Sequence, residues 1–140
     1  MTKHFLQNRD GFDVHVLRSR FVEVGIVPAP GAKIISLRCL SSGREWMWSP
    51  HATRLFANQT GDPFPDSTIV GADECFPTIT GCSWAGRELP DHGEAWSEPW
   101  TVEGSDDGVV TTLTCPISPF DLQRTARLCD NELLLSYELT

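Results

Sequence analysis

Hydrophobic and polar residues alternate with a period of two along much of the chain, which is typical of β-strands that are buried on one face. The segments 21–28 and 32–40 show this pattern and are separated by the turn-forming residues Pro-Ala-Pro-Gly. A Ser-Ser-Gly turn follows, and it predicts a third strand over 44–48. No span of ten or more residues has helical periodicity, so the first part of the chain is predicted to be all-β.

The same pattern returns in the last third of the chain. The segments predicted to form strands there are 95–104, 108–116, 121–130 and 132–140. Asp130 and Asn131 provide a two-residue turn between the last two of them. The final segment, Leu-Leu-Leu-Ser-Tyr-Glu-Leu-Thr, has no closing turn signal, and an unprotected strand edge invites pairing with another chain. We therefore expect either a homo-oligomer through this open edge or a longer sequence of which this is the front part.

The middle of the chain, from 49 to about 89, has a different composition. Glycine and proline recur too often there for long regular elements, as in Gly-Asp-Pro-Phe-Pro-Asp. Long irregular segments within a compact domain are usually functional or disordered, and the aromatic residues and cysteines of this one argue against disorder. We interpret 1–140 as a single β-sandwich domain with a functional loop segment.

Composition narrows the classes of partner. The chain has 140 residues, of which 40% are hydrophobic and 21% charged, the balance of a globular domain. A formal net charge of −8 argues against a nucleic-acid partner, which would require a basic surface. No apolar run is long enough to span a bilayer, so no membrane partner is expected. The N-terminal residues lack the apolar stretch of a secretion signal, which makes cytoplasmic the expected location.

The five cysteines are odd in number, which favours free thiols over a disulfide framework. A metal site is an alternative that the spacing of Cys75, Cys82 and His92 leaves open, but zinc sites usually contain a tighter cysteine pair. We predict no metal and no cofactor.

The stretch 86–100, Gly-Arg-Glu-Leu-Pro-Asp-His-Gly-Glu-Ala-Trp-Ser-Glu-Pro-Trp, contains the most suggestive chemistry. His92 lies in a proline–glycine turn, where Asp91 or Glu94 could orient its imidazole. Trp84 and Trp96 flank this loop and could pack against the apolar face of a sugar ring. The remaining tryptophans are expected to fill the core, and they are Trp46, Trp48 and Trp100.

The order of several motifs resembles the aldose 1-epimerase (galactose mutarotase) superfamily. The resemblance rests on Pro-Gly-Ala-Lys-Ile-Ile-Ser-Leu-Arg-Cys-Leu-Ser-Ser-Gly-Arg-Glu-Trp-Met-Trp near the start and on a final hairpin with an arginine in its first strand. Between them, Gly-Ala-Asp-Glu-Cys-Phe-Pro and then Leu-Pro-Asp-His-Gly-Glu-Ala-Trp resemble the hexose-6-phosphate epimerase branch. The resemblance covers nearly the whole chain. It implies the N-terminal half of a twisted antiparallel β-sandwich, the supersandwich of that superfamily.

The resemblance also implies a function. It makes His92 a catalytic group that interconverts the anomers of a small-molecule carbohydrate by acid–base catalysis. The residues that we expect to bind the sugar are Glu74, Thr78, Trp84, Asp91 and Trp96. The second histidine and the glutamate base of the family match no position here. The alternative is therefore a noncatalytic carbohydrate-binding module. A neutral sugar is favoured over a phosphorylated one, because Trp96 stands where the sugar-phosphate branch has an arginine.

Overall fold

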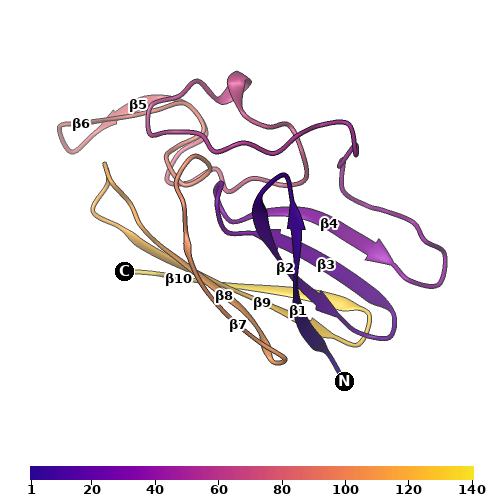
Figure 1. The fold of residues 1–140 in the computed structure, drawn as a ribbon. Coiled ribbons are helices and arrows are strands. Elements are labelled where there is room, and N and C mark those ends of the chain that lie inside the picture. The colour runs from indigo at the N-terminus through magenta and orange to yellow at the C-terminus, as the bar shows by residue number, and fades with distance from the viewer.

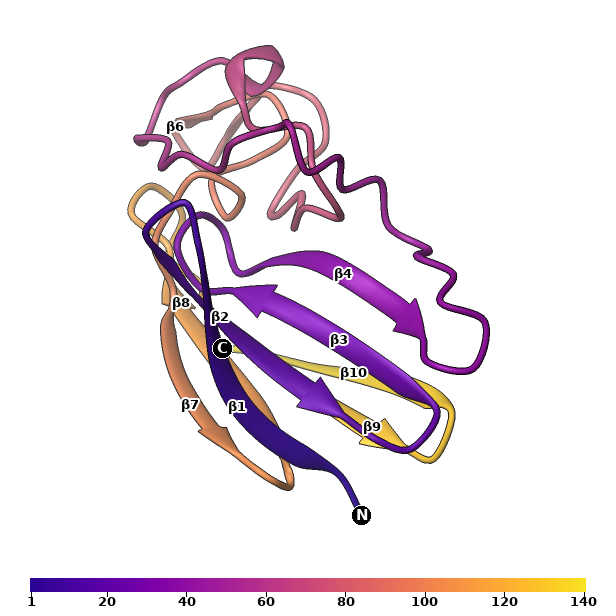
Figure 2. The same ribbon diagram turned by 45° about the vertical axis from the view of Figure 1, so that its right-hand side comes forward.

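The computed structural model describes residues 1–140 and contains two four-stranded antiparallel sheets that pack face to face (Figures 1 and 2). The first sheet has the strand order β1–β2–β3–β4, with bounds Lys3–Arg9, Phe12–Arg18, Val22–Val27 and Lys33–Cys39. The second has the order β10–β9–β8–β7, and the bounds of β7 to β10 are Thr101–Ser105, Gly108–Thr114, Asp121–Cys129 and Glu132–Leu139. The prediction of an all-β antiparallel sandwich is confirmed.

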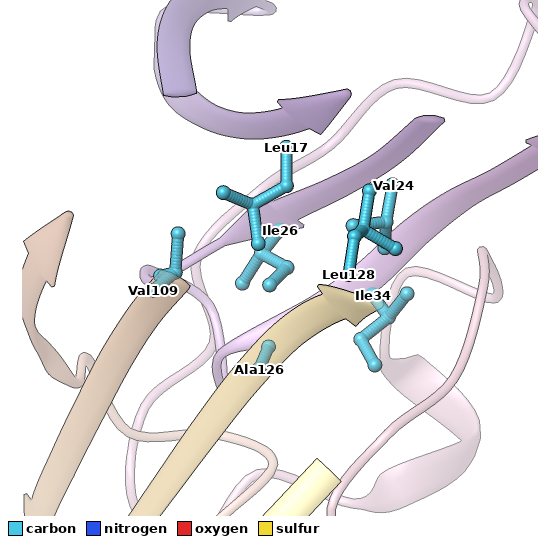
Figure 3. Packing of buried hydrophobic residues seen from close by; sticks show 7 residues of the cluster. All are labelled: Leu17, Val24, Ile26, Ile34, Val109, Ala126 and Leu128. Carbon is cyan, nitrogen blue, oxygen red and sulfur yellow. The ribbon is translucent and has the colours of Figure 1, made fainter. Parts of the chain in front are cut away.

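The main core lies between the two sheets (Figure 3). Its buried side chains are Leu17, Val24, Ile26 and Ile34 from the first sheet and Val109, Ala126 and Leu128 from the second. These residues occupy alternate positions along their strands, so each strand directs its apolar face inward. Burial of this apolar face is the main force that holds the sheets together.

The strand predictions were right where the alternation is regular and wrong at two places. The segments 21–28, 32–40, 108–116, 121–130 and 132–140 correspond to β3, β4, β8, β9 and β10. The third strand expected over 44–48 is absent, and only an isolated bridge joins Arg38 to Glu45. The strand expected from residue 95 begins only at Thr101. The hairpin of β1 and β2 was not predicted.

The segment between β4 and β7 is mostly irregular and gathers at one end of the sandwich (Figures 1 and 2). It contains a 3-10 turn, η1 (Phe64–Asp66), and a small hairpin of β5 (Cys82–Trp84) and β6 (Arg87–Leu89). Leu55 and Val70 from this segment pack on the outer face of the first sheet in a second apolar cluster. No helix in the structure is long and apolar enough to cross a membrane.

β10 is an edge strand whose inner face is partly uncovered. Leu135, Tyr137 and Leu139 lie opposite Ala126, Arg124 and Leu122 of β9 and therefore share their face of the sheet. The β9 residues are buried, whereas Leu135, Tyr137 and Leu139 are 38%, 49% and 51% exposed. The first sheet therefore leaves the inner face of β10 open. Pairing of this edge with a second chain stays a prediction.

Candidate functional site

The backbone around His92 has a conformation that few residues adopt. His92 and Gly93 follow β6, and their φ angles are +61° and +73°, both in the left-handed region. A Cβ at position 93 would lie 2.2 Å from the carbonyl oxygen of Phe76, so only glycine fits there. A left-handed backbone at a non-glycine residue such as His92 is energetically strained. Such strain is typical of sites where the surrounding structure imposes a particular side-chain direction.

The loop is fixed by hydrogen bonds at both ends. The carbonyl oxygen of Phe76 accepts from the backbone N–H groups of Glu94 and Ala95, at 2.8 Å and 3.1 Å. The Glu94 side chain is fully buried, and its carboxylate accepts from the backbone N–H groups of Ile117 and Ser118. The Ser118 hydroxyl donates to the same carboxylate at 2.5 Å. Glu94 thus joins the His92 loop to the turn before β9 and is unavailable to a ligand.

The imidazole of His92 is held on two sides. Its Nδ1 lies 2.8 Å from a carboxylate oxygen of Asp91. The ring stacks on Phe64 of η1, with 3.8 Å between ring centroids and 7° between the ring planes. The side chain is 30% exposed, and Nε2 makes no hydrogen bond within the chain. In the neutral ring, a carboxylate on Nδ1 favours the tautomer with the proton on that nitrogen and the lone pair on Nε2.

Trp96 contacts the Phe64 ring that stacks on His92. Phe64 contacts the Trp96 indole edge-on at a centroid distance of 5.2 Å. The Trp96 side chain is nearly fully buried, and its Nε1–H donates to the carbonyl oxygen of Gly93 at 3.1 Å. The indole therefore packs against the Phe64 ring and offers no open face to a ligand.

The other tryptophans divide into exposed and buried groups. Trp84 at the end of β5 is 44% exposed and packs against Phe120, with 5.5 Å between ring centroids. Trp100 is buried in a cluster beneath the site, as expected. Trp46 and Trp48 are 58% and 70% exposed, so the prediction that they fill the core is wrong. They lie in the segment that fails to become a third strand and passes outside the sandwich.

The pair Asp73–Glu74 is held by buried cations. The ammonium of Lys33, almost fully buried, pairs with Asp73 and also donates to the carbonyl oxygen of Thr68 at 3.0 Å. The buried guanidinium of Arg124 donates to Oε1 of Glu74 at 2.6 Å. Each carboxylate therefore compensates a charge that would be costly to bury alone.

Glu74 also reaches the open face of β10. The Tyr137 hydroxyl donates to Oε1 of Glu74 at 2.7 Å. Burial raises the pKa of Tyr137 to about 12, and the hydrogen bond and charge of Glu74 add to that effect. The second carboxylate oxygen, Oε2, makes no hydrogen bond within the chain. Glu74 can therefore still accept a hydrogen bond from a ligand hydroxyl.

The Glu74 and His92 loops lie near one another. Burial raises the pKa of the Cys75 thiol, and the charges of Asp73 and Glu74 raise it further, with a smaller contribution from Asp91. The two loops are in contact, because the carbonyl oxygen of Phe76, two residues after Glu74, accepts from the backbone N–H groups of Glu94 and Ala95. The site joins elements that are far apart in the sequence.

Thr78 and the cysteines complete the region. The Thr78 hydroxyl donates to the carbonyl oxygen of Thr80 at 2.7 Å. All five cysteines are free thiols. No group of three histidine, cysteine or acidic side chains is close enough to hold a metal ion, so Cys75, Cys82 and His92 do not form the metal site considered as an alternative.

Sequence reasoning missed several residues of this region. Phe64 lies in the motif Gly-Asp-Pro-Phe-Pro-Asp, where an aromatic side chain between two prolines was a usable signal. Arg124 was recognised only as part of a hairpin, and neither Lys33 nor Tyr137 was linked to the Asp73–Glu74 pair. Their contacts with this pair span 40 to 63 positions in sequence, so no local pattern could reveal them.

Comparison with known proteins identifies a fold but no family. No family model and no curated protein matches the sequence. Among solved structures, the chain is similar to the crystal structure of 4-alpha-glucanotransferase from Thermococcus litoralis, with a TM-score of 0.61 and 12% sequence identity. The match covers 99% of this chain and 24% of that chain, so this chain spans about a quarter of the solved structure. At such low identity the likeness shows the fold alone.

Proposed function

We propose that the protein binds a carbohydrate beside His92 and interconverts its anomers by acid–base catalysis, as an aldose 1-epimerase does. The observation that carries the proposal is the state of the His92 imidazole. Asp91 occupies Nδ1, Phe64 fixes the plane of the ring, and Nε2 is left free on a part-exposed side chain. A free, fixed imidazole nitrogen is what proton transfer to or from a bound sugar requires.

The chemistry needs two proton transfers. Opening of the sugar ring requires a proton on the ring oxygen and removal of the proton from the anomeric hydroxyl, and closure on the other face reverses both steps. We assign one of these transfers to Nε2 of His92 and the other to a water molecule, since no position here matches the second acid–base group of the family. Asp91 is a positioning residue in this scheme, because its carboxylate acts through Nδ1 and fixes the orientation of the ring.

Two further groups would bind the sugar itself. Oε2 of Glu74 would accept from a sugar hydroxyl, while Tyr137 and Arg124 hold Oε1 in place. The exposed indole of Trp84 would pack against the apolar face of the ring. Thr78 remains a sugar-binding candidate from the sequence, whereas Asp91 would act through the His92 imidazole and Trp96 through the Phe64 ring.

Two independent lines support a carbohydrate as the ligand. The order of motifs along the chain resembles the aldose 1-epimerase superfamily. The fold also occurs within a protein named as a 4-alpha-glucanotransferase. The likeness to the glucanotransferase assigns no reaction, so the proposed reaction depends on the resemblance of the motifs and on the geometry at His92.

The test is anomer exchange measured by NMR magnetisation transfer on glucose and galactose, with the wild-type chain and His92→Asn. Asparagine tolerates the left-handed backbone of position 92 better than alanine, so the variant should keep the fold. We expect exchange above the uncatalysed rate in the wild type and a loss of at least about 100-fold in the variant, the usual contribution of a general acid–base group. Glu103→Gln, an exposed change on β7, should leave exchange unchanged.

The positioning role of Asp91 has its own readout. Asp91→Asn should lower kcat while KM for the sugar stays near the wild-type value, because the amide would favour the wrong imidazole tautomer without disturbing the sugar contacts. Equal exchange rates in wild type and His92→Asn would refute the catalytic proposal. Sugar binding without exchange in the wild type would instead establish the alternative, a noncatalytic carbohydrate-binding module.

A further inference from the structure

A polar cavity lies on the outer face of the first sheet, away from the His92 site. Its volume is about 500 Å³, within the range of small-ligand sites. The floor is formed by Val14, Val16, Gly25 and Ile35, and the segment 43–51 supplies much of the rim. None of the residues placed in the His92 site lines this cavity.

The walls of the cavity are fixed by hydrogen bonds. The Arg9 guanidinium donates to the Ser49 hydroxyl at 2.7 Å. It also donates to the backbone carbonyl oxygens of Pro50 and Thr53, so it joins β1 to the rim. The Glu45 carboxylate accepts from the Ser36 hydroxyl at 2.6 Å and from two backbone N–H groups. These contacts preform the cavity, which lowers the ordering cost of binding.

Other lining groups have no partner within the chain. The side chains of Gln7, Arg38 and His51 face the cavity and make no hydrogen bond to the rest of the protein. They supply donors and acceptors from two strands and from the rim. Ligand sites commonly combine an apolar floor with a few such polar groups that fix orientation.

The charges and shape of the cavity select a class of ligand. Its two arginines, Arg9 and Arg38, are balanced by the two carboxylates of Glu23 and Glu45. Gly25 is buried, and the floor is closed around it, because a Cβ at that position would lie 3.3 Å from Val14 and 3.7 Å from Ile35. The groups open to a ligand are therefore the polar side chains of the walls and rim. We infer that this cavity is a second binding site, for a neutral polyhydroxylated ring such as a mono- or disaccharide. The ring bonds its hydroxyls to Gln7, Arg38 and His51.

This inference does not depend on the proposed function, because the two sites share no residue. The experiment uses the 140-residue chain with His92→Asn, so that sugar seen to bind is not turned over. Backbone amide NMR spectra are recorded during titration with maltose and glucose, and with glucuronate and inorganic phosphate as anionic probes. We expect the neutral sugars to shift the amide signals of Gly25, Gly43 and Ser49, which belong to the floor and rim.

Two variants test the assignment. Gly25→Val would crowd the floor, because a Cβ at that position already lies 3.3 Å from Val14, so the floor must shift and sugar binding should weaken by at least about tenfold. Arg38→Gln would remove a charged donor and should weaken binding about tenfold even if Gly25→Val folds poorly. Arg127→Gln, an exposed change on β9 of the other sheet, is the matched control and should bind as the parent does.

Three outcomes would overturn the inference. Sugar-induced shifts confined to the 91–93 loop would place the only site at His92. Binding of glucuronate or phosphate without maltose or glucose would show that the ligand class is wrong. Unchanged affinity in both Gly25→Val and Arg38→Gln would show that the sugar binds elsewhere.

Discussion

Replacement of Glu94 tests the account of how the His92 loop is held. Its buried carboxylate is the acceptor for the backbone N–H groups of Ile117 and Ser118, at 2.6 Å and 2.9 Å, and for the Ser118 hydroxyl. Glu94→Ala leaves all three donors without this acceptor. The hydroxyl can rotate to another partner, but the two N–H groups cannot.

The magnitude follows from these contacts. A buried donor that loses its acceptor costs about 1–3 kcal/mol, so two backbone N–H groups cost about 2–6 kcal/mol. Removal of a buried charge relieves part of that cost, and we expect a net loss of about 3 kcal/mol in the free energy of unfolding. Glu94→Gln keeps one acceptor oxygen but turns an NH₂ group toward a donor, and should cost about 2 kcal/mol. Either loss is a large share of the 5–15 kcal/mol typical of whole domains.

The assay is equilibrium unfolding in urea, followed by tryptophan fluorescence and far-UV circular dichroism. The midpoint should fall in the order wild type, Glu94→Gln, Glu94→Ala, with an unchanged slope. Glu103→Ala, an exposed carboxylate on β7, should stay within about 0.5 kcal/mol of the wild type. A Glu94→Ala protein within about 1 kcal/mol of the wild type would refute the claim that this carboxylate anchors the loop.

Three further predictions follow from local geometry. Gly93→Ala should unfold at a much lower temperature than Gly86→Ala, because both glycines have positive φ but only position 93 would place a Cβ 2.2 Å from a backbone oxygen; equal melting temperatures would contradict this. Burial, and then the neighbouring His4, lower the pKa of His15 below 6.5. As pH falls through about 6.5, the unfolded chain therefore binds a proton at His15 before the folded protein does, and the urea midpoint should decrease. Midpoints that rise over that range would show that His15 does not control the pH dependence of stability. Hydrogen bonds from two serines in the following turn lower the pKa of Cys39 to about 6. At pH 7 iodoacetamide should therefore modify Cys39 before the other thiols, which peptide mass spectrometry can follow. Preferential modification of another cysteine would contradict this prediction.

The sandwich could be predicted because its strands carry regular alternation between clear turns. β3, β4, β8, β9 and β10 all follow that rule. The hairpin of β1 and β2 carried the same signal, with Asp10 and Gly11 as its turn, and should have been recognised. The segment 44–48 is apolar enough for a strand, yet Glu45 there bonds to Ser36 and to backbone groups instead of extending the sheet. Tertiary contacts therefore overrode a local pattern.

The candidate site was predictable only in part. The motif around His92 was visible because a histidine between an acid and a glycine in a turn is unusual. The roles of the surrounding side chains were not visible, since Trp96 and Trp84 look equivalent in sequence and differ only in burial. Pairing of Lys33 with Asp73 and of Arg124 with Glu74 depends on how the sheets and loops pack. The cavity on the first sheet likewise arises from strands and a rim that are distant in sequence.

The main-chain anchoring of the His92 loop has a consequence for how such a protein could diversify. The loop that carries the imidazole is held largely by backbone groups: the N–H of His92 donates to the carbonyl oxygen of Ile79, and the carbonyl oxygen of Phe76 accepts from the N–H groups of Glu94 and Ala95. Exposed side chains that do not anchor the loop, such as Trp84, can therefore be exchanged while the histidine stays in place. In laboratory evolution, ligand preference should drift freely at such positions, whereas Gly93 and Glu94 should resist replacement.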